Sequence, residues 1–185
     1  MIKDLMNEIE NHMKGTIEAT KRELAAVRTG RASASLLDRV VVEYYGTPTP
    51  LKQLANISVP EARMIIIQPW DKSALSAVEK AIQKADLGLN PVNDGVTIRL
   101  PVPQLTEERR KELVKVVKKE AEEKRVVIRN LRRDANEKAK ALEKDGHVSE
   151  DEVKRALDDI QKLTDKYILE IDKLLDHKEK EIMEV

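Results

Sequence analysis

Apolar side chains recur every three or four positions along the first thirty residues, with polar residues between them. Ile9, Met13 and Ile17 show this spacing. Because an α-helix turns once in about 3.6 residues, such positions share one face of a helix. We therefore expect an amphipathic helix over residues 2–29, with Gly30 as its C-cap.

The pattern changes between residues 31 and 104. The prolines at positions 48–60 lie too close together for a helix, and Asp71 or Ser73 can cap a short one. Strands are predicted where β-branched and aromatic residues concentrate or alternate with polar ones, at residues 39–46, 64–68 and 96–100. This segment is therefore expected to be a small inserted β/α/β domain.

Helical spacing returns after Pro103. Thr106 can serve as the N-cap of a helix that continues to about Lys144. Ser149 and Glu152 form a capping box, which predicts another long helix after a short turn. Because their apolar stripes are too narrow to be buried singly, residues 1–30 and 105–185 are predicted to form one three-helix bundle.

The inserted domain is joined to this bundle by two crossings of the chain. Both crossings are expected at the same end of the bundle, because the first helix finishes where the second begins. The predicted fold class is therefore α+β, an elongated three-helix bundle with the small domain at one end, giving an L-shaped molecule. The residues of the crossings are the predicted hinge: Gly30, Arg31, Pro103, Gln104 and Leu105.

The composition indicates a cellular location, and the charged residues are unevenly distributed along the chain. The chain has no Cys, no apolar run of membrane-spanning length and no secretory signal at its start, so we expect a cytoplasmic protein. Its net charge is zero, but residues 109–133 carry eleven basic and four acidic side chains. Residues 149–185 carry seven basic and twelve acidic ones. A basic helix is thus followed by an acidic helix.

The basic helix has its cations on one side. On a helical wheel they fall in one sector, which we place nearly opposite the apolar row: Lys111, Lys115, Lys118, Arg125, Arg129, Arg132 and Arg133. Arginine offers planar, bidentate donors that suit phosphate, which favours RNA or another polyanion as the partner. The aromatic residues lie outside this helix, so recognition of backbone shape is expected. A second basic group near the hinge consists of Arg28, Arg31, Arg109 and Arg110.

The sequence contains no recognisable catalytic motif. His12, His147 and His177 lack metal-ligand spacing, and no Gly-rich phosphate loop occurs. We therefore expect no catalytic residues, no metal site, no cofactor and no enzymatic activity. Asp158 and Asp159 are interpreted as part of a solvated acidic face. The alternative is a helical coiled-coil adaptor that uses this acidic face to bind a partner.

Several motifs resemble the ribosome recycling factor family along essentially the whole chain. They are Val27–Ala32, Val41–Pro50, Ile67–Asp71, Asn90–Pro103 and, most strongly, Val127–Asn136. The resemblance implies a monomer shaped like transfer RNA that binds the large ribosomal subunit and acts with elongation factor G, which hydrolyses GTP, to separate the subunits. It also implies RNA-contacting arginines at Arg28, Arg31, Arg110, Arg129 and Arg132, with Arg133 adjacent to them.

Overall fold

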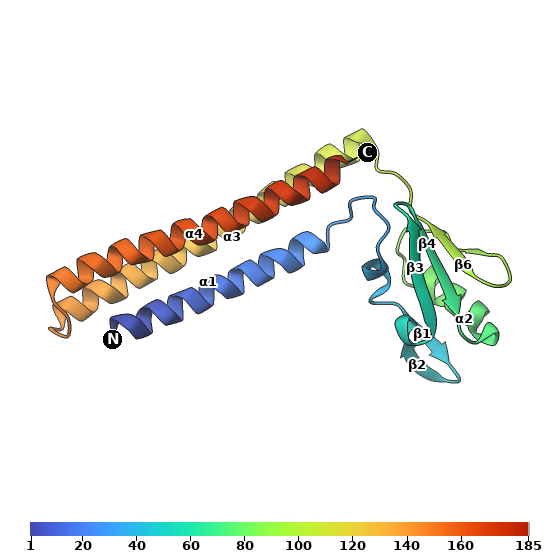
Figure 1. Cartoon of the computed structure of the whole chain (residues 1–185), viewed down its shortest axis with the longest axis horizontal. Coiled ribbons are helices and arrows are strands. Elements are labelled where there is room, and N and C mark those ends of the chain that lie inside the picture. Colours follow the sequence, from blue (N-terminus) through green and yellow to red (C-terminus); the bar gives the residue numbers. More distant parts are fainter. Residues whose placement is uncertain (185) are drawn as a thin grey trace. The chain divides into compact units, whose positions relative to one another are not determined.

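The computed structural model describes residues 1–184, which divide into two compact units (Figure 1). One unit contains residues 1–28 and 107–184, and the other contains residues 29–106. The α+β fold class is confirmed, because the first unit is helical and the second contains the sheets. The L shape concerns the placement of one unit relative to the other, and it stays a prediction.

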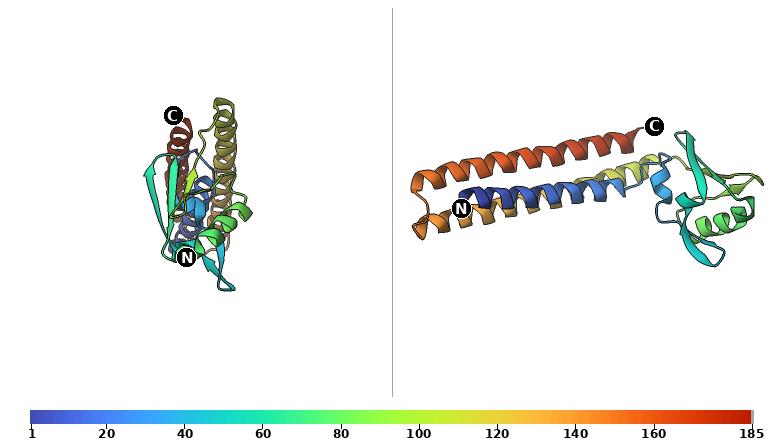
Figure 2. Two further views of the ribbon diagram at one scale, coloured as in Figure 1. Left: turned by 90° about the vertical axis from the view of Figure 1, so that its right-hand side faces the viewer. Right: turned by 60° about the horizontal axis from the view of Figure 1, so that its bottom comes forward.

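The first unit consists of three long helices that pack along one another (Figure 2). They are α1 (Ile2–Ala25), α3 (Glu107–Lys144) and α4 (Glu150–Met183). The apolar stripes meet in one core in which Met13, Ile128 and Ile171 are completely buried. This burial supplies most of the stability of the helices, because isolated helices are marginal in water.

The helix ends agree with the sequence in one place and differ in another. Ser149 caps α4 as predicted, since its side chain accepts a hydrogen bond from the amide of Glu152 at 3.2 Å. The prediction for the end of the first helix is wrong. Helix α1 ends at Ala25, with Ala26 as its C-cap, and Gly30 lies beyond it. Leu24 is the last buried residue of α1, so further helical turns would gain no core packing.

The second unit contains a hairpin, a four-stranded sheet and a short helix. Strands β1 (Val41–Tyr44) and β2 (Thr47–Pro50) form the hairpin. The antiparallel sheet has the order β3-β4-β6-β5, made of β3 (Ala55–Glu61), β4 (Met64–Pro69), β6 (Ile98–Pro101) and β5 (Val92–Asn93). Three single turns, η1 (Ala34–Leu37), η2 (Leu51–Gln53) and η3 (Lys72–Ala74), and helix α2 (Leu75–Lys84) complete it.

The second unit contains more strands than the β/α/β prediction, which did not include β2, β3 and β5. Strand β2 contains Pro48 and Pro50, and β3 contains Pro60. These strands lie in a two-stranded hairpin and at the edge of the sheet, where a missing amide donor is tolerated. Asp71 caps the single turn η3 rather than the short helix itself, since it accepts a hydrogen bond from the amide of Ser73 at 2.9 Å. Helix α2 follows η3 directly, with Ala74 at its N-cap position and no side-chain cap.

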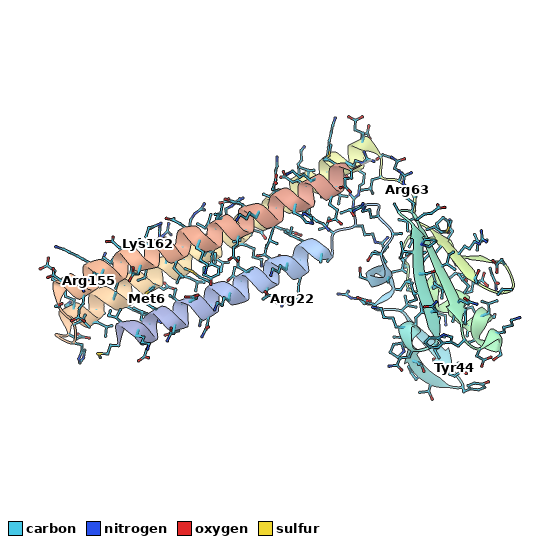
Figure 3. The ribbon with its side chains drawn as sticks, in the orientation of Figure 1. Met6, Arg22, Tyr44, Arg63, Arg155 and Lys162 are labelled. Carbon is cyan, nitrogen blue, oxygen red and sulfur yellow. The ribbon has the colours of Figure 1, made fainter. Side chains whose placement is uncertain are left out.

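Both connecting segments are attached to the β3–β4 turn of the second unit. The amide of Ala32 donates to the carbonyl of Ala62 at 2.7 Å, and that of Val102 donates to the carbonyl of Arg63 at 2.8 Å. The Arg63 side chain, labelled in Figure 3, also donates to the Gln104 amide oxygen at 3.1 Å. Part of the predicted hinge is therefore held against the sheet.

Position 30 requires glycine because of its backbone conformation and because Leu105 lies close to it. Its φ of +79° lies in the left-handed region, and a Cβ there would lie 3.1 Å from Cγ of Leu105. We expect Gly30→Ala to lower the free energy of unfolding by about 1–3 kcal/mol, measured by denaturant titration. Gly15→Ala is the matched control. It lies within α1 with no atom within 4 Å of the added Cβ, so it should stabilise by about 0.5–1 kcal/mol. Equal effects would contradict this interpretation.

Candidate nucleic-acid interface

The basic side chains of α3 divide into two rows rather than one sector. Lys118, Arg125 and Arg132 are spaced seven residues apart, and we call them the inner row. Nζ of Lys118 lies 4.0 Å from Glu179 and Nη2 of Arg125 lies 2.6 Å from Asp172, both on α4. The inner row therefore lines the junction between α3 and α4.

Four acidic side chains of α4 have the same spacing as the inner row, and we call them the acidic row. Asp158, Asp165, Asp172 and Glu179 also occur every seventh residue, in the opposite direction. Two sequence predictions are therefore corrected. The inner row lies beside the core rather than opposite to it, and the acidic face of α4 is partly paired with α3 rather than wholly solvated. A wheel drawn for one helix could not show this, because it omits the neighbouring helix.

Arg125 has its charge satisfied within the bundle. Its side chain is only 18% exposed and contacts both Asp172 and Glu122. Burial opposes the charge of Arg125, but hydrogen bonds to the two carboxylates outweigh it and raise the pKa of the guanidinium above its ordinary value. Removing one partner from such a pair leaves an uncompensated charge. Arg125 is therefore a structural residue of the bundle.

Arg129 and Arg133 lie on the outer side of the inner row. The Arg129 side chain is 39% exposed and contacts Glu122 at 3.0 Å, while Arg133 is exposed. Hydrogen bonds from Arg129 and then from Arg125 hold the pKa of the Glu122 carboxyl below its usual range. Glu122 thus orders two arginines, and it leaves part of the Arg129 guanidinium accessible.

Arg132 contacts a neutral side chain, unlike Arg125 and Arg129, which contact carboxylates. It is half-buried, and its Nη1 donates to Oε1 of Gln161 on α4 at 3.3 Å. Nε2 of Gln161 in turn donates to Oδ1 of Asp165 at 2.8 Å. A neutral amide therefore separates Arg132 from the carboxylate that matches it in the acidic row.

The second basic group is divided between the two units. Arg28, Arg109 and Arg110 belong to the helical unit and Arg31 to the other. Arg28 and Arg31 are exposed, whereas Arg110 is half-buried, and within residues 1–184 its Nε has no hydrogen-bond partner. Arg109 forms a 2.9 Å ion pair with Glu112. Arg110 therefore has a buried N–H donor without a partner among residues 1–184.

Two exposed aromatic residues on the second unit were not selected from the sequence. Tyr45 is 82% and Trp70 is 69% exposed. Tyr44 lies next to Tyr45 and donates a hydrogen bond from its hydroxyl to Asp71 at 2.8 Å, which raises the pKa of Tyr44 to about 12. Tyr44 and Arg63 lie at opposite ends of this unit (Figure 3). Exposure cannot be read from residue types, so these two positions could not be recognised as surface aromatics from the sequence.

Residues 1–184 contain no group of three or more His, Cys, Asp and Glu side chains able to hold a metal ion. None of the helices in this range combines the length and the apolar character that crossing a membrane requires. The α3 surface beside α4, where several arginines are held by named partners, is therefore the main candidate site.

Comparison with known proteins decides the family. The family described as ribosome recycling factor matches residues 20–183 of the chain. The chain belongs to this family. Ribosome-recycling factors from Heliobacterium modesticaldum and Syntrophomonas wolfei are 62% and 60% identical to it over the full length of both chains.

Solved structures of ribosome recycling factors support the same assignment. A solution structure of the factor is 52% identical, with a TM-score of 0.78, and covers 100% of this chain and 98% of its own. A second similar structure comprises models of the T. thermophilus ribosome recycling factor and the E. coli elongation factor G bound to the E. coli post-termination complex. It is 49% identical, has a TM-score of 0.65 and covers both chains completely.

Proposed function

We propose that this protein binds the large ribosomal subunit of post-termination complexes. With elongation factor G and GTP, it promotes dissociation of the ribosome from mRNA for a new round of translation. It acts as a monomer in the cytoplasm, without a cofactor or catalytic residues of its own. The observation that carries the proposal is the arginine set on α3, in a chain that belongs to the recycling factor family.

The arginines have different parts in this proposal. Arg129, Arg132 and Arg133 contact phosphates of ribosomal RNA, because their guanidinium groups are at least partly accessible. Arg28, Arg31 and Arg110 form a second group of contacts. Arg125 is not included, because Asp172 and Glu122 already satisfy it. Phosphate contacts fix the position of a protein on RNA without reading its sequence.

The two units have different roles in the proposed function. The helical unit holds the RNA, and the unit of residues 29–106 receives elongation factor G. Force then passes through the connecting segments, Gly30–Arg31 and Pro103–Leu105. These segments act as a hinge, so subunit separation depends on them more strongly than binding does.

Co-sedimentation with purified large subunits over a series of salt concentrations tests the proposal. RNA binding through several phosphates should give a negative slope of log affinity against log salt, because each neutralised phosphate releases counterions. A coiled-coil adaptor would not sediment, or would do so without salt dependence. Pairing of the acidic row with α3 already weighs against the adaptor, since it leaves less of that face for a partner.

The acidic residues outside these pairs should matter little for binding. Asp158 and Asp159 are exposed on α4. We expect the double variant Asp158→Asn with Asp159→Asn to bind large subunits within about threefold of the unchanged protein, because exposed charges contribute little individually. The measurement is the same co-sedimentation assay. A large loss of binding would instead indicate a partner that recognises the acidic face.

A further inference from the structure

The inner row contains two arginines in equivalent positions but with different partners. Arg125 and Arg132 are seven residues apart, and each is directed toward α4. Arg125 contacts the carboxylate of Asp172 directly at 2.6 Å. Arg132 contacts the amide of Gln161, and the carboxylate of Asp165 lies behind that amide. The difference therefore lies in the group that each arginine meets on α4.

The orientation of the Gln161 amide follows from its partners. A guanidinium can only donate hydrogen bonds, so the amide oxygen must face Arg132. An ionised carboxylate can only accept, so the amide nitrogen must face Asp165. The 2.8 Å bond to Asp165 thus holds the acceptor oxygen toward the arginine. Without Asp165 the amide could rotate and present its nitrogen to Arg132.

We propose that Gln161 and Asp165 are positioning residues that orient Arg132 for a phosphate of ribosomal RNA without neutralising it. This inference rests on the proposed function. The neutral amide uses one of the five guanidinium N–H donors and leaves the others for a bidentate phosphate contact. Asp165 acts through the amide. Arg125 shows the alternative, in which a direct carboxylate keeps the arginine for the bundle.

The direct test gives Arg132 a carboxylate partner, as Arg125 has in Asp172. Gln161→Glu has nearly the same shape but places a carboxylate against Arg132. We expect its affinity for purified large subunits to fall by about tenfold, close to the loss from Arg132→Ala. The slope of log affinity against log salt should become shallower by about one, as for removal of a phosphate contact. The thermal midpoint should change little, because the new ion pair with Arg132 is offset by loss of the bond to Asp165 and by repulsion between the two carboxylates.

Lys162→Gln is the matched control. It changes the net charge by the same amount at the neighbouring exposed position of α4, which Figure 3 labels. We expect a loss of no more than about twofold and a slope within experimental error of that of the unchanged protein. Asp165→Asn should give an intermediate, few-fold loss, since the Gln161 amide is then no longer fixed.

Three results would overturn this inference. Unchanged affinity and slope for Gln161→Glu, at any thermal midpoint, would show that Gln161 only joins the helices. Equal losses for Gln161→Glu and Lys162→Gln would show an effect of net charge. A gain in affinity for Asp165→Asn would show that the carboxylate competes with RNA. Failure of the proposed function is distinguishable, because the unchanged protein would then show no salt-dependent binding at all.

Discussion

Arg132→Ala is expected to weaken binding to the large ribosomal subunit by about tenfold or more, because a hydrogen-bonded charged contact is lost. Arg132 lies on α3 beside Gln161 and is only half-buried. Its removal should leave the thermal midpoint nearly unchanged, because its hydrogen-bond partner on α4 is the exposed amide of Gln161. Titration of large subunits at several salt concentrations should give a slope shallower by about one.

Arg155→Ala is the matched control for this prediction. Arg155 is an exposed arginine on α4, labelled in Figure 3, and lies outside the α3 set. It removes the same charge and the same side chain. We expect binding within about twofold of the unchanged protein. Unchanged binding by Arg132→Ala, or equal losses from both variants, would contradict the assignment of Arg132. Unfolding of Arg132→Ala would show that its role is structural.

The second large effect is expected on subunit separation rather than on binding. The site of an added Cβ on Gly30 lies 3.1 Å from Cγ and 3.5 Å from the amide nitrogen of Leu105. A disulfide between Gly30→Cys and Leu105→Cys is therefore within reach. It would make the two connecting segments move as one, so a change of hinge angle becomes harder. Separation of ribosomal subunits in a reconstituted assay with elongation factor G should slow by about tenfold or more, if motion through the hinge limits this step.

The reduced form of the same variant is the control. It carries the same strain at position 30, and the chain has no other Cys to confuse the oxidation. Large-subunit affinity should agree within a few-fold between the oxidised and reduced forms. Full separation activity in the oxidised protein would contradict the hinge. Equal loss of binding and separation on oxidation would mean that free movement of the connections is needed for docking.

The long helices could be predicted because their signals are local. The apolar spacing around Ile128 and Ile171 and the cap at Ser149 each lie within a few residues of sequence. Strands β2 and β3 were missed for a physical reason. Their prolines argue against a central strand, and only the finished topology shows that these strands lie in a hairpin and at an edge.

The candidate site could be predicted only in part. The arginine-rich helix was visible, but the different environments of Arg125 and Arg132 depend on which residue α4 places beside each of them. One signal for this was present in the sequence. The seven-residue spacing of the acidic residues from Asp158 to Glu179 matches that of the inner row. Comparing the two helices, rather than drawing a wheel for each, would have predicted the pairing.

The most direct test of the account is a cryo-electron microscopy structure of this protein bound to the large ribosomal subunit. We predict that the guanidinium groups of Arg129 and Arg132 lie within hydrogen-bond distance of phosphate oxygens of ribosomal RNA. Arg125 should remain on Asp172, and Gln161 should remain between Arg132 and Asp165. A complex in which the arginine side of α3 faces solvent or a ribosomal protein, with no RNA phosphate near Arg132, would contradict the account.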